Sequence, residues 1–329
     1  MKLSYLIIVT VAVSIFIIYK CNNKKICKVE DFKIESSYPY LSTDYSIFLT
    51  PNVLLCNNHS LEIKDSSIPI IFVDAEILTE NIDKLLELKN NYNLITTSNN
   101  DICMPYVSYP CPDDIKIKYD RLLNHDRLNK WYTKNPSIVH NKLIPLPIGP
   151  KMQWSNTSFF GEPKAKILSI YNKNFLEPEI LFKDTSLKNN LLYININPGT
   201  TDNPYYKEHK NIRRKALTDL KNKGFKSSSN KSIEDYIVEL KTYKFCLSPP
   251  GNGIDTHRTW ESLLVGTIPI CITSPLDSIM TDLPVLIVDD YSVINDAYLE
   301  EQYKKIHDRD YDFSSLYCDY WKNRIRNLE

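Results

Sequence analysis

The chain has 329 residues, of which 43% are hydrophobic and 24% are charged, values that are ordinary for a folded protein of about two domains. Its 40 basic residues balance its 40 acidic residues, which excludes a broad basic surface of the kind that binds nucleic acid. Glycine is scarce: of only seven, Gly251, Gly253 and Gly266 fall within sixteen residues. This cluster indicates a backbone geometry that side chains would block.

An uncharged apolar run occupies residues 3–19 and is followed by several lysines. Its length is at the short end for a membrane span of about 20 residues, and no small-residue cleavage site follows it, which favours an uncleaved anchor over a signal peptide. We assign residues 1–22 to a transmembrane segment and 23–40 to a stalk. The lysines after the run outnumber Lys2, so the positive-inside rule would place the body in the cytoplasm.

Strand-like and helix-like patterns alternate after the stalk. A short apolar run at 69–73 predicts a buried strand that ends at Asp74, and a helical pattern starts after Thr79. Further along, the patterns predict a strand at 92–96, a helix at 115–132 and a strand at 138–148. We therefore expect an α/β lobe over residues 41–165.

The second half has a cleaner pattern. Residues 150–190 look irregular, and we place the connection between the domains there. Beyond it, strands are expected at 191–196, 245–247, 268–272 and 285–288, with helices at 208–223 and from Ser232 onward. Gly224 closes the first of these helices, and Ser232 caps the second with Asp235 three residues later. Residues 166–329 are thus predicted to form a parallel sheet with helices on both faces.

Residues 245–270 form a strand–loop–helix–strand unit. The strand must end at Leu247, because the prolines of Ser-Pro-Pro-Gly-Asn-Gly lack N–H donors and the glycines favour turns. Asp255 or Thr256 can cap the helix that follows, and Gly266 ends it. In parallel sheets, ligands bind at the carboxyl ends of the strands, beside such a helix N-terminus.

Two charged residues share one face of this helix. Arg258 lies in the first turn, where a cation opposes the helix dipole unless an anion is bound there. Backbone N–H groups and Arg258 can together hold a diphosphate, and Glu261, three residues later, can accept hydrogen bonds from ribose hydroxyls. The alternative is a weak surface ion pair between the two side chains.

The segment around this helix resembles the exostosin family of glycosyltransferases. The matching residues, in order and spacing, are Phe245, Cys246, Leu247, Pro250, Gly251, Arg258, Glu261, Gly266 and Pro269. Strand 191–196 followed by Arg213 is similar to the family's phosphate-side arginine region. The resemblance covers residues 191–292, about a third of the chain, and the N-terminal half has no motif that matches.

The resemblance implies two Rossmann-like lobes of the GT-B type behind the transmembrane helix, with a nucleoside-diphosphate sugar, usually UDP-linked, bound by the C-terminal lobe. It also implies inversion at the anomeric carbon, no cofactor and no essential metal, a hydroxyl acceptor on a glycan or glycoprotein, and a type II arrangement with the body in the Golgi or ER lumen. The donor-binding residues assigned on this basis are Arg213, Gly251, Asn252, Gly253, Thr256, Arg258 and Glu261.

Transfer to a hydroxyl also needs a base, which is commonly a carboxylate or a histidine. Asp74 follows an apolar strand, so we name it as the catalytic candidate, with Glu76 and His140 as further candidates. Each of the three is also explained as an ordinary strand-end or surface residue.

Two other classes of protein stay open. A GT-A transferase would hold a metal ion with an acidic pair after a strand, for which Asp74 with Glu76, or Asp308 with Asp310, has the right letters. A non-catalytic, membrane-anchored carbohydrate-binding or structural protein on a transferase-like fold is the other alternative.

Overall fold

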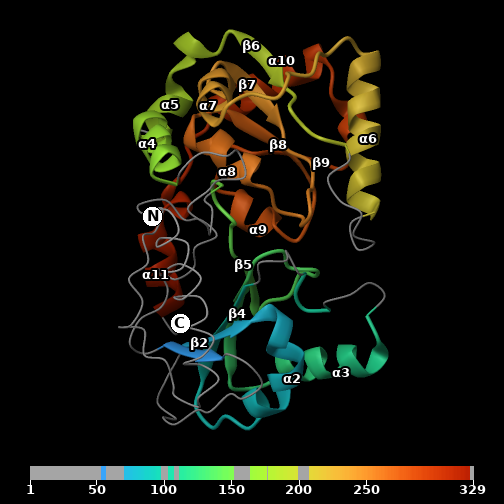
Figure 1. Ribbon diagram of the computed structural model, residues 1–329, viewed down its shortest axis with the longest axis vertical. Helices are drawn as coiled ribbons and strands as arrows, with labels where there is room; N and C mark the ends of the chain where they lie inside the picture. Colours follow the sequence, from blue (N-terminus) through green and yellow to red (C-terminus); the bar gives the residue numbers. More distant parts are fainter. Residues whose placement is uncertain are drawn as a thin grey trace, which may run out of the picture.

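The computed structural model describes residues 53–56, 70–97, 103–106, 111–151, 164–175, 177–198 and 207–326. These residues form two sheets, one with the strand order β1-β2-β3-β4-β5 and the other with the order β6-β7-β8-β9, and every pairing is parallel (Figure 1). The α/β architecture of two parallel, Rossmann-like sheets is therefore confirmed. The predicted anchor (1–22) and stalk (23–40) lie outside the described residues, and none of the described helices is long and apolar enough to span a bilayer.

The first sheet has helices on both faces. Its strands are β1 (Val53–Cys56), β2 (Ile70–Asp74), β3 (Tyr92–Thr97), β4 (Leu128–Thr133) and β5 (Leu143–Pro145). Ile71 and Val73 of β2 pack in one cluster with helices α2 (Ala75–Leu86) and α3 (Asp113–Leu123), while Ile70 belongs to a second cluster. Successive strand residues point to opposite faces, so this sheet is buried on both sides.

The expected helix at 115–132 is wrong in its second half. Helix α3 ends at Leu123, and Asn124 folds back so that its side chain donates a hydrogen bond to the Asp120 carbonyl. Residues Leu128–Thr133 form β4 instead, and the side chain of Trp131 in this strand is fully buried. Aromatic and β-branched residues fit a pleated surface, and this preference decides the structure here. Helix α2 also begins earlier than expected, directly after Asp74.

The second sheet follows the sequence closely. Its strands are β6 (Asn190–Tyr193), β7 (Tyr243–Leu247), β8 (Ile268–Ile272) and β9 (Leu286–Val288), and its principal helices are α6 (Lys207–Asn222), α7 (Ile233–Leu240), α8 (His257–Leu264) and α10 (Asp296–His307). The predicted helix ends are confirmed: the Ser232 hydroxyl accepts from the Asp235 N–H, and Gly224 and Gly266 both have positive φ just after a helix.

Residues 150–190, expected to be irregular, contain two helices, α4 (Lys164–Asn174) and α5 (Pro178–Lys183). Tyr171 and Phe175 stack on each other and join the second lobe's hydrophobic core, which explains why a segment of weak periodicity is helical. The short elements are η3 (Thr185–Leu187), α9 (Asp277–Met280), η5 (Tyr291–Val293) and η6 (Ser314–Leu316).

Helix α11 (Cys318–Arg326) runs back from the second lobe and packs beside the first sheet (Figure 1). The Asn93 side chain donates to the Ile325 carbonyl at 2.8 Å, and the Tyr132 hydroxyl donates to the Arg324 carbonyl at 3.1 Å. The domain boundary at 165/166 stays a prediction, but residues 318–326 clearly contact the sheet of the first lobe.

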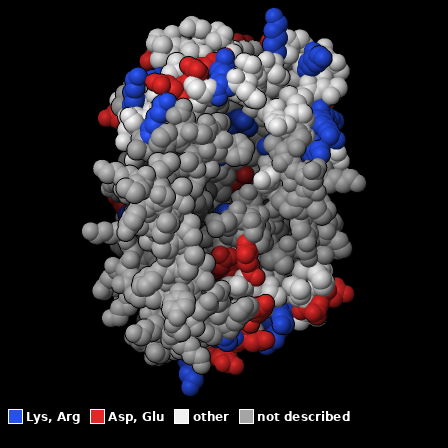
Figure 2. All heavy atoms as spheres, in the orientation of Figure 1, with Lys and Arg blue, Asp and Glu red and all other residues white. Residues whose placement is uncertain are grey.

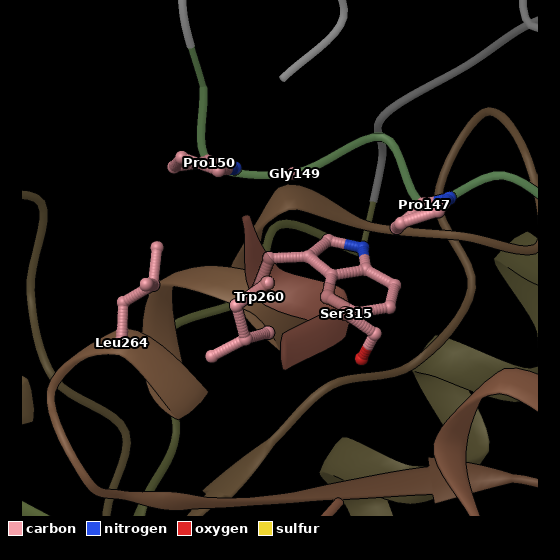
Figure 3. A pocket seen from close by; sticks show the side chains of 7 residues that line it. Pro147, Gly149, Pro150, Trp260, Leu264 and Ser315 are labelled. Carbon is pink, nitrogen blue, oxygen red and sulfur yellow. The ribbon is translucent and has the colours of Figure 1, made fainter. Parts of the chain in front are cut away.

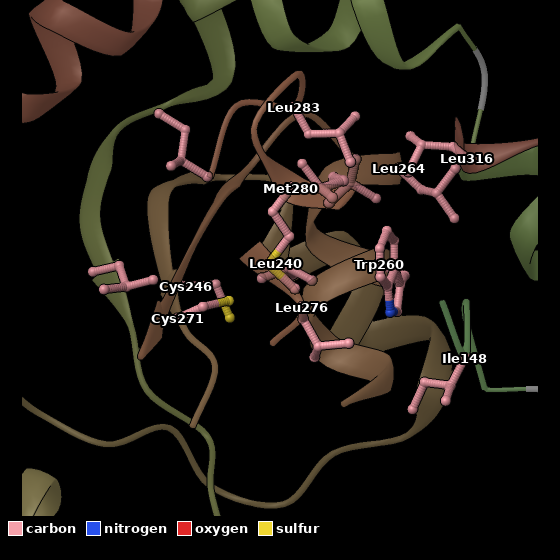
Figure 4. Packing of buried hydrophobic residues seen from close by; sticks show 14 of the residues in the cluster. Ile148, Leu240, Cys246, Trp260, Leu264, Cys271, Leu276, Met280, Leu283 and Leu316 are labelled. Carbon is pink, nitrogen blue, oxygen red and sulfur yellow. The ribbon is translucent and has the colours of Figure 1, made fainter. Parts of the chain in front are cut away.

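The core of the second lobe is built around the apolar face of α8. Trp260 and Leu264 lie one turn apart on this face and pack with Leu316 and with Ile148 from the first lobe (Figure 4). Cys246 and Cys271 are buried as thiols on adjacent strands. The cluster therefore spans both lobes and fixes α8 at their junction.

Candidate functional site

The carboxyl ends of the two sheets face each other. The loop after β7, residues 248–256, reaches Asn135, which follows β4 by two residues: the Asp255 N–H donates to the Asn135 Oδ1 at 3.0 Å. Gly253 lies so close that a Cβ there would be 2.4 Å from the Asn135 amide. Because ligands bind at the carboxyl ends of parallel strands, the junction between the lobes is the candidate site.

Asp255 holds this loop in place. Its carboxylate is buried and accepts from the Ile148 N–H at 2.9 Å, from the Thr256 N–H at 2.8 Å and from the Trp260 indole N–H. Thr256 occupies the N-cap position of α8, but its side chain makes no capping hydrogen bond. Instead, its hydroxyl lies 2.8 Å from the Ser248 hydroxyl, within a buried cluster of hydroxyl groups.

Arg213 reaches the same loop from α6. Its Nε donates to the Pro250 carbonyl at 2.5 Å and one of its terminal amines donates to the Asn197 carbonyl at 3.0 Å. A Cβ at Gly251 would lie only 3.0 Å from this guanidinium, so a side chain at position 251 would crowd the arginine. Burial and the neighbouring charge of Arg258 lower the pKa of Arg213 to about 10.

Arg258 lies beside Arg213, in the first turn of α8. One terminal amine donates to the Asn195 carbonyl, in the loop after β6 that also binds Arg213. Its Nε is buried and has no hydrogen-bond partner among the described residues. Two guanidinium groups therefore converge at the carboxyl edge of the second sheet, and one of their donors is left for a ligand. Basic side chains are also present on the outer surface of the second lobe, in the upper half of the view (Figure 2).

Glu261 is buried rather than exposed, so it forms no surface ion pair with Arg258. Its Oε1 accepts from the Tyr171 hydroxyl at 3.0 Å and from the Lys151 N–H at 3.1 Å, and its Oε2 accepts from the Tyr236 hydroxyl at 2.8 Å. Burial, and then the negative charge of Glu261, raise the pKa of both tyrosines well above the usual value. A carboxylate offers about four acceptor sites, and these contacts use three of them.

The other predicted loop residues have different surroundings. Asn252 is the exposed tip of the loop. Both main-chain groups of Gly251 have partners. Its N–H donates to the Gly253 carbonyl at 2.8 Å, and its C=O lies 3.1 Å from Nδ1 of His209. Burial lowers the pKa of His209. Gly251 and Gly253 thus shape the loop, while Asn252 is the member of the trio that faces solvent.

The candidate bases lie in the first lobe. Asp74 ends β2 at the carboxyl edge of its sheet, and its Oδ1 accepts from the Glu76 N–H at 2.9 Å, which makes it the N-cap of α2. Glu76 is exposed in the first turn of that helix. His140 precedes β5 and accepts from the Lys142 N–H at 3.2 Å, so it lies at the opposite, amino edge of the sheet. Of the three, only Asp74 and Glu76 are at the edge that faces the second lobe.

The sequence did not predict a role for three residues at the junction, which are Asn135, Lys151 and His257. Nδ1 of His257 lies 2.8 Å from the Gly149 carbonyl. The signal that could have found two of these contacts is the segment Pro-Ile-Gly-Pro-Lys, in which Gly149, four residues after the end of β5, has a φ of 64°. A glycine in that conformation marks a special backbone path at a sheet edge.

A narrow crevice lies on the other side of α8, lined by Trp260, Leu264 and the 147–150 segment (Figure 3). Its space of about 170 Å³ includes open solvent, whereas ligand pockets usually occupy about 300–1,000 Å³. Apart from Ser315, the residues that line it are apolar or glycine, and none of them is charged. The crevice does not suit a nucleotide, so the site is assigned to the face of α8 that carries Arg258.

Within the described ranges, no group of three or more His, Cys, Asp or Glu side chains is close enough to hold a metal ion. Asp308 is the C-cap of α10, and Asp310 is 3.3 Å from the Lys183 ammonium group. The second acidic pair considered for a GT-A site therefore belongs to a helix end and a surface ion pair.

The chain matches no family model, and it matches no curated protein. The similarity of residues 245–270 to exostosins stays a resemblance between motifs.

Proposed function

We propose that the protein is a glycosyltransferase of the GT-B type. It would move a sugar from a nucleoside-diphosphate sugar, with UDP as the nucleotide, to a hydroxyl group of a glycan or glycoprotein, with inversion and without an essential metal. The observation that carries the proposal is the convergence of Arg213 and Arg258 at the carboxyl edge of the second sheet, beside the N-terminus of α8.

The two arginines suit a diphosphate leaving group. Negative charge develops on the diphosphate as the glycosidic bond breaks, and fixed cations stabilise that charge most when they are already in place. Arg213 and Arg258 are held by carbonyl oxygens of the 195–197 and 250 backbone, so they need no rearrangement. The Thr256 side chain leaves the first turn of α8 uncapped, which adds the backbone N–H groups of a helix N-terminus to the same site.

The architecture favours GT-B over GT-A. Two separate parallel sheets meet at their carboxyl edges, which provides one lobe for the donor and one for the acceptor. The first acidic residue of the alternative metal motif, Asp74, uses one oxygen to cap α2. The anchor at residues 1–22, with the body in the Golgi or ER lumen, remains part of this proposal.

Titration calorimetry with UDP and UDP-sugars tests the donor site. Arg258→Ala should weaken UDP binding by about 10- to 100-fold, because hydrogen bonds to charged groups contribute about 1.5–3 kcal/mol. Arg214→Ala is the matched control, since Arg214 is the exposed neighbour of Arg213 on α6 and should bind UDP like the wild type.

Two outcomes would contradict the proposal. Wild-type affinity in Arg258→Ala would remove Arg258 from the donor site, and a folded wild-type chain that binds no nucleotide would favour the non-catalytic carbohydrate-binding alternative. Donor hydrolysis measured with a chelator separates the remaining class: activity lost in chelator and restored by a divalent cation would favour a metal-dependent GT-A mechanism.

A further inference from the structure

The tip of the loop between β7 and α8 is an exposed asparagine between two glycines. Asn252 faces solvent, and its side-chain amide has no hydrogen-bond partner in the part of the chain that the structure describes. Gly253 follows it. The Gly253 C=O accepts from the Gly251 N–H at 2.8 Å, whereas the Gly253 N–H donates to no acceptor among the described residues. The loop tip therefore places an accessible amide next to an unbonded backbone nitrogen.

This pairing of residues suits a reaction of the chain with itself. Asparagine is one of the residues that heat and time damage, because its side-chain amide can be lost. The reaction begins when the backbone nitrogen of the next residue attacks Cγ of the asparagine. Attack is easiest when that nitrogen is not engaged as a hydrogen-bond donor and when its residue has no Cβ to obstruct the approach. Gly253 meets both conditions beside Asn252.

Two other exposed asparagines lack these conditions and serve as internal references. Asn124 is followed by His125, whose N–H donates to a backbone carbonyl at 3.1 Å. Asn222 is followed by Lys223, whose N–H donates to a backbone carbonyl at 3.2 Å. In both pairs the attacking nitrogen is engaged and its residue carries a side chain. Exposure is thus shared by all three asparagines, and the state of the next N–H distinguishes Asn252.

We propose that Asn252 and Gly253 form a site of spontaneous deamidation and isomerisation, and that the reaction disrupts the loop that joins the two lobes. The Gly253 nitrogen bonds to Cγ of Asn252 while the bond from Cγ to Nδ2 breaks. The proton of the Gly253 N–H passes through water to the departing nitrogen, which leaves as ammonia. Water then opens the resulting succinimide ring: addition at Cγ gives aspartate, and addition at the main-chain carbonyl gives isoaspartate. Water is the only co-reactant, and nothing is oxidised or reduced.

Isoaspartate at position 252 would add one carbon to the main chain between Gly251 and Gly253. This stretch has no slack, because the hydrogen bond between the two glycines closes it into a small ring. Both glycines also lie against other elements: a Cβ would be 3.0 Å from the Arg213 guanidinium at Gly251, and 2.4 Å from the Asn135 amide at Gly253. The added carbon therefore separates the loop from at least one of these partners and weakens the junction between the lobes.

The test follows the purified full-length chain as it ages at physiological temperature and mildly alkaline pH. Peptide mapping by mass spectrometry measures deamidation at each asparagine, and labelling by an isoaspartate-specific methyltransferase detects the isomerised product. We expect position 252 to be converted well before Asn124 and Asn222 in the same sample. Asn252→Gln is the matched variant: it keeps the amide at an exposed position, but its longer side chain must form a larger ring, so it should stay intact.

Urea unfolding reports the consequence for the junction, with each preparation compared with its own fresh sample. The midpoint of the wild type should fall as isoaspartate accumulates, and that of Asn252→Gln should not change with age. Fresh Asn252→Asp carries the charge of the product without the added carbon, so its midpoint should stay near that of the fresh wild type. The effect of ageing on UDP affinity rests on the proposed donor site, whereas the modification and the change in midpoint do not.

Each other outcome has a distinct meaning. An Asn252 that stays intact while Asn124 or Asn222 is converted overturns the proposed site. Full conversion to isoaspartate with an unchanged urea midpoint overturns the proposed disruption of the loop. Conversion with a lowered midpoint, in a chain that bound no UDP when fresh, supports the modification site and contradicts the proposed transferase.

Discussion

The two lobes pass from strand to helix in different ways. In the first lobe, β2 runs directly into α2, and Asp74 is both the last residue of the strand and the cap of the helix. In the second lobe, residues 248–256 separate β7 from α8. Only this loop has room to recruit side chains from other elements, and it contacts Arg213 of α6 and Asn135 of the opposite lobe. The comparison indicates that a ligand site at a strand end depends on the loop as much as on the sheet.

Replacing the aspartate of each connection should have the most different effects on the stability of the protein. Replacing Asp255 by alanine leaves the N–H groups of Ile148, Thr256 and Trp260 without their acceptor in a buried place, which should cost about 3–5 kcal/mol. Asp74→Ala removes one capping bond and should cost about 1 kcal/mol. Urea unfolding followed by circular dichroism measures both, and equal losses would show that the two connections are equivalent.

Two glycine substitutions distinguish the stability that comes from contact between the lobes from the cost of local backbone strain. A Cβ at Gly253 would be 2.4 Å from the amide of Asn135, which is buried and hydrogen-bonded to Asp255, so Gly253→Ala should destabilise the protein by about 2–3 kcal/mol. Gly224 has a φ of +89° but nothing within 4 Å of its Cβ position, so Gly224→Ala should cost only about 1 kcal/mol. A smaller loss for Gly253→Ala than for Gly224→Ala would mean that the lobes can separate here at little cost.

Asparagine at position 74 distinguishes helix capping from catalysis. Asn caps helices about as well as Asp, so Asp74→Asn should change the free energy of unfolding by less than about 0.5 kcal/mol. If Asp74 is also the base, transfer to the acceptor should fall by about 100-fold or more in the same variant, while UDP binding stays normal. Unchanged transfer would leave Asp74 with the capping role alone. Comparing kcat with the UDP affinity of the same preparation gives this answer.

The smallest effects are expected from exposed ion pairs, of which each lobe offers one example: Lys116–Asp120 at 2.7 Å and Lys215–Asp290 at 2.5 Å. The hydrogen bond from each lysine holds the pKa of its aspartate below the usual value. A carboxyl with a lowered folded-state pKa stabilises the protein above its unfolded pKa, and this contribution is lost as the pH falls through the folded pKa.

Urea midpoints measured between about pH 5 and about pH 3 test these pairs. Lys116→Met and Lys215→Met should each make the loss of stability in acid slightly shallower, and high salt should remove most of the difference, because water and ions screen exposed pairs. A large effect that persists in high salt would show that a pair is more shielded from solvent than its exposure indicates.

The second lobe was predictable from sequence because its helices have clear ends. Gly224, Ser232 and Gly266 mark these ends through backbone conformation or capping, and both signals are local. The first lobe and residues 150–190 lack such signals. There, Trp131 and Tyr132 belong to a strand and Tyr171 to a helix because of the surfaces that they bury, and a short apolar segment does not reveal its partners.

In the candidate site, too, local features were predictable from the sequence and long-range contacts were not. Arg258 and Glu261 share a helical face, and the three-residue spacing was enough to predict this. The surroundings of Glu261 were not predictable, because its contact with Lys151 joins residues 110 positions apart. For the same reason, the sequence left a surface ion pair open as an alternative, whereas Glu261 is a buried carboxylate between two tyrosine hydroxyls.

The return of α11 to the first sheet affects how the chain folds during synthesis. The hydrogen bonds from Asn93 and Tyr132 to this helix span 232 and 192 residues of sequence. These two contacts therefore cannot form on the ribosome until the whole second lobe has emerged, and contacts of such long range form slowly. Among the described residues, the first lobe thus depends for part of its packing on a helix that is synthesised after the second lobe.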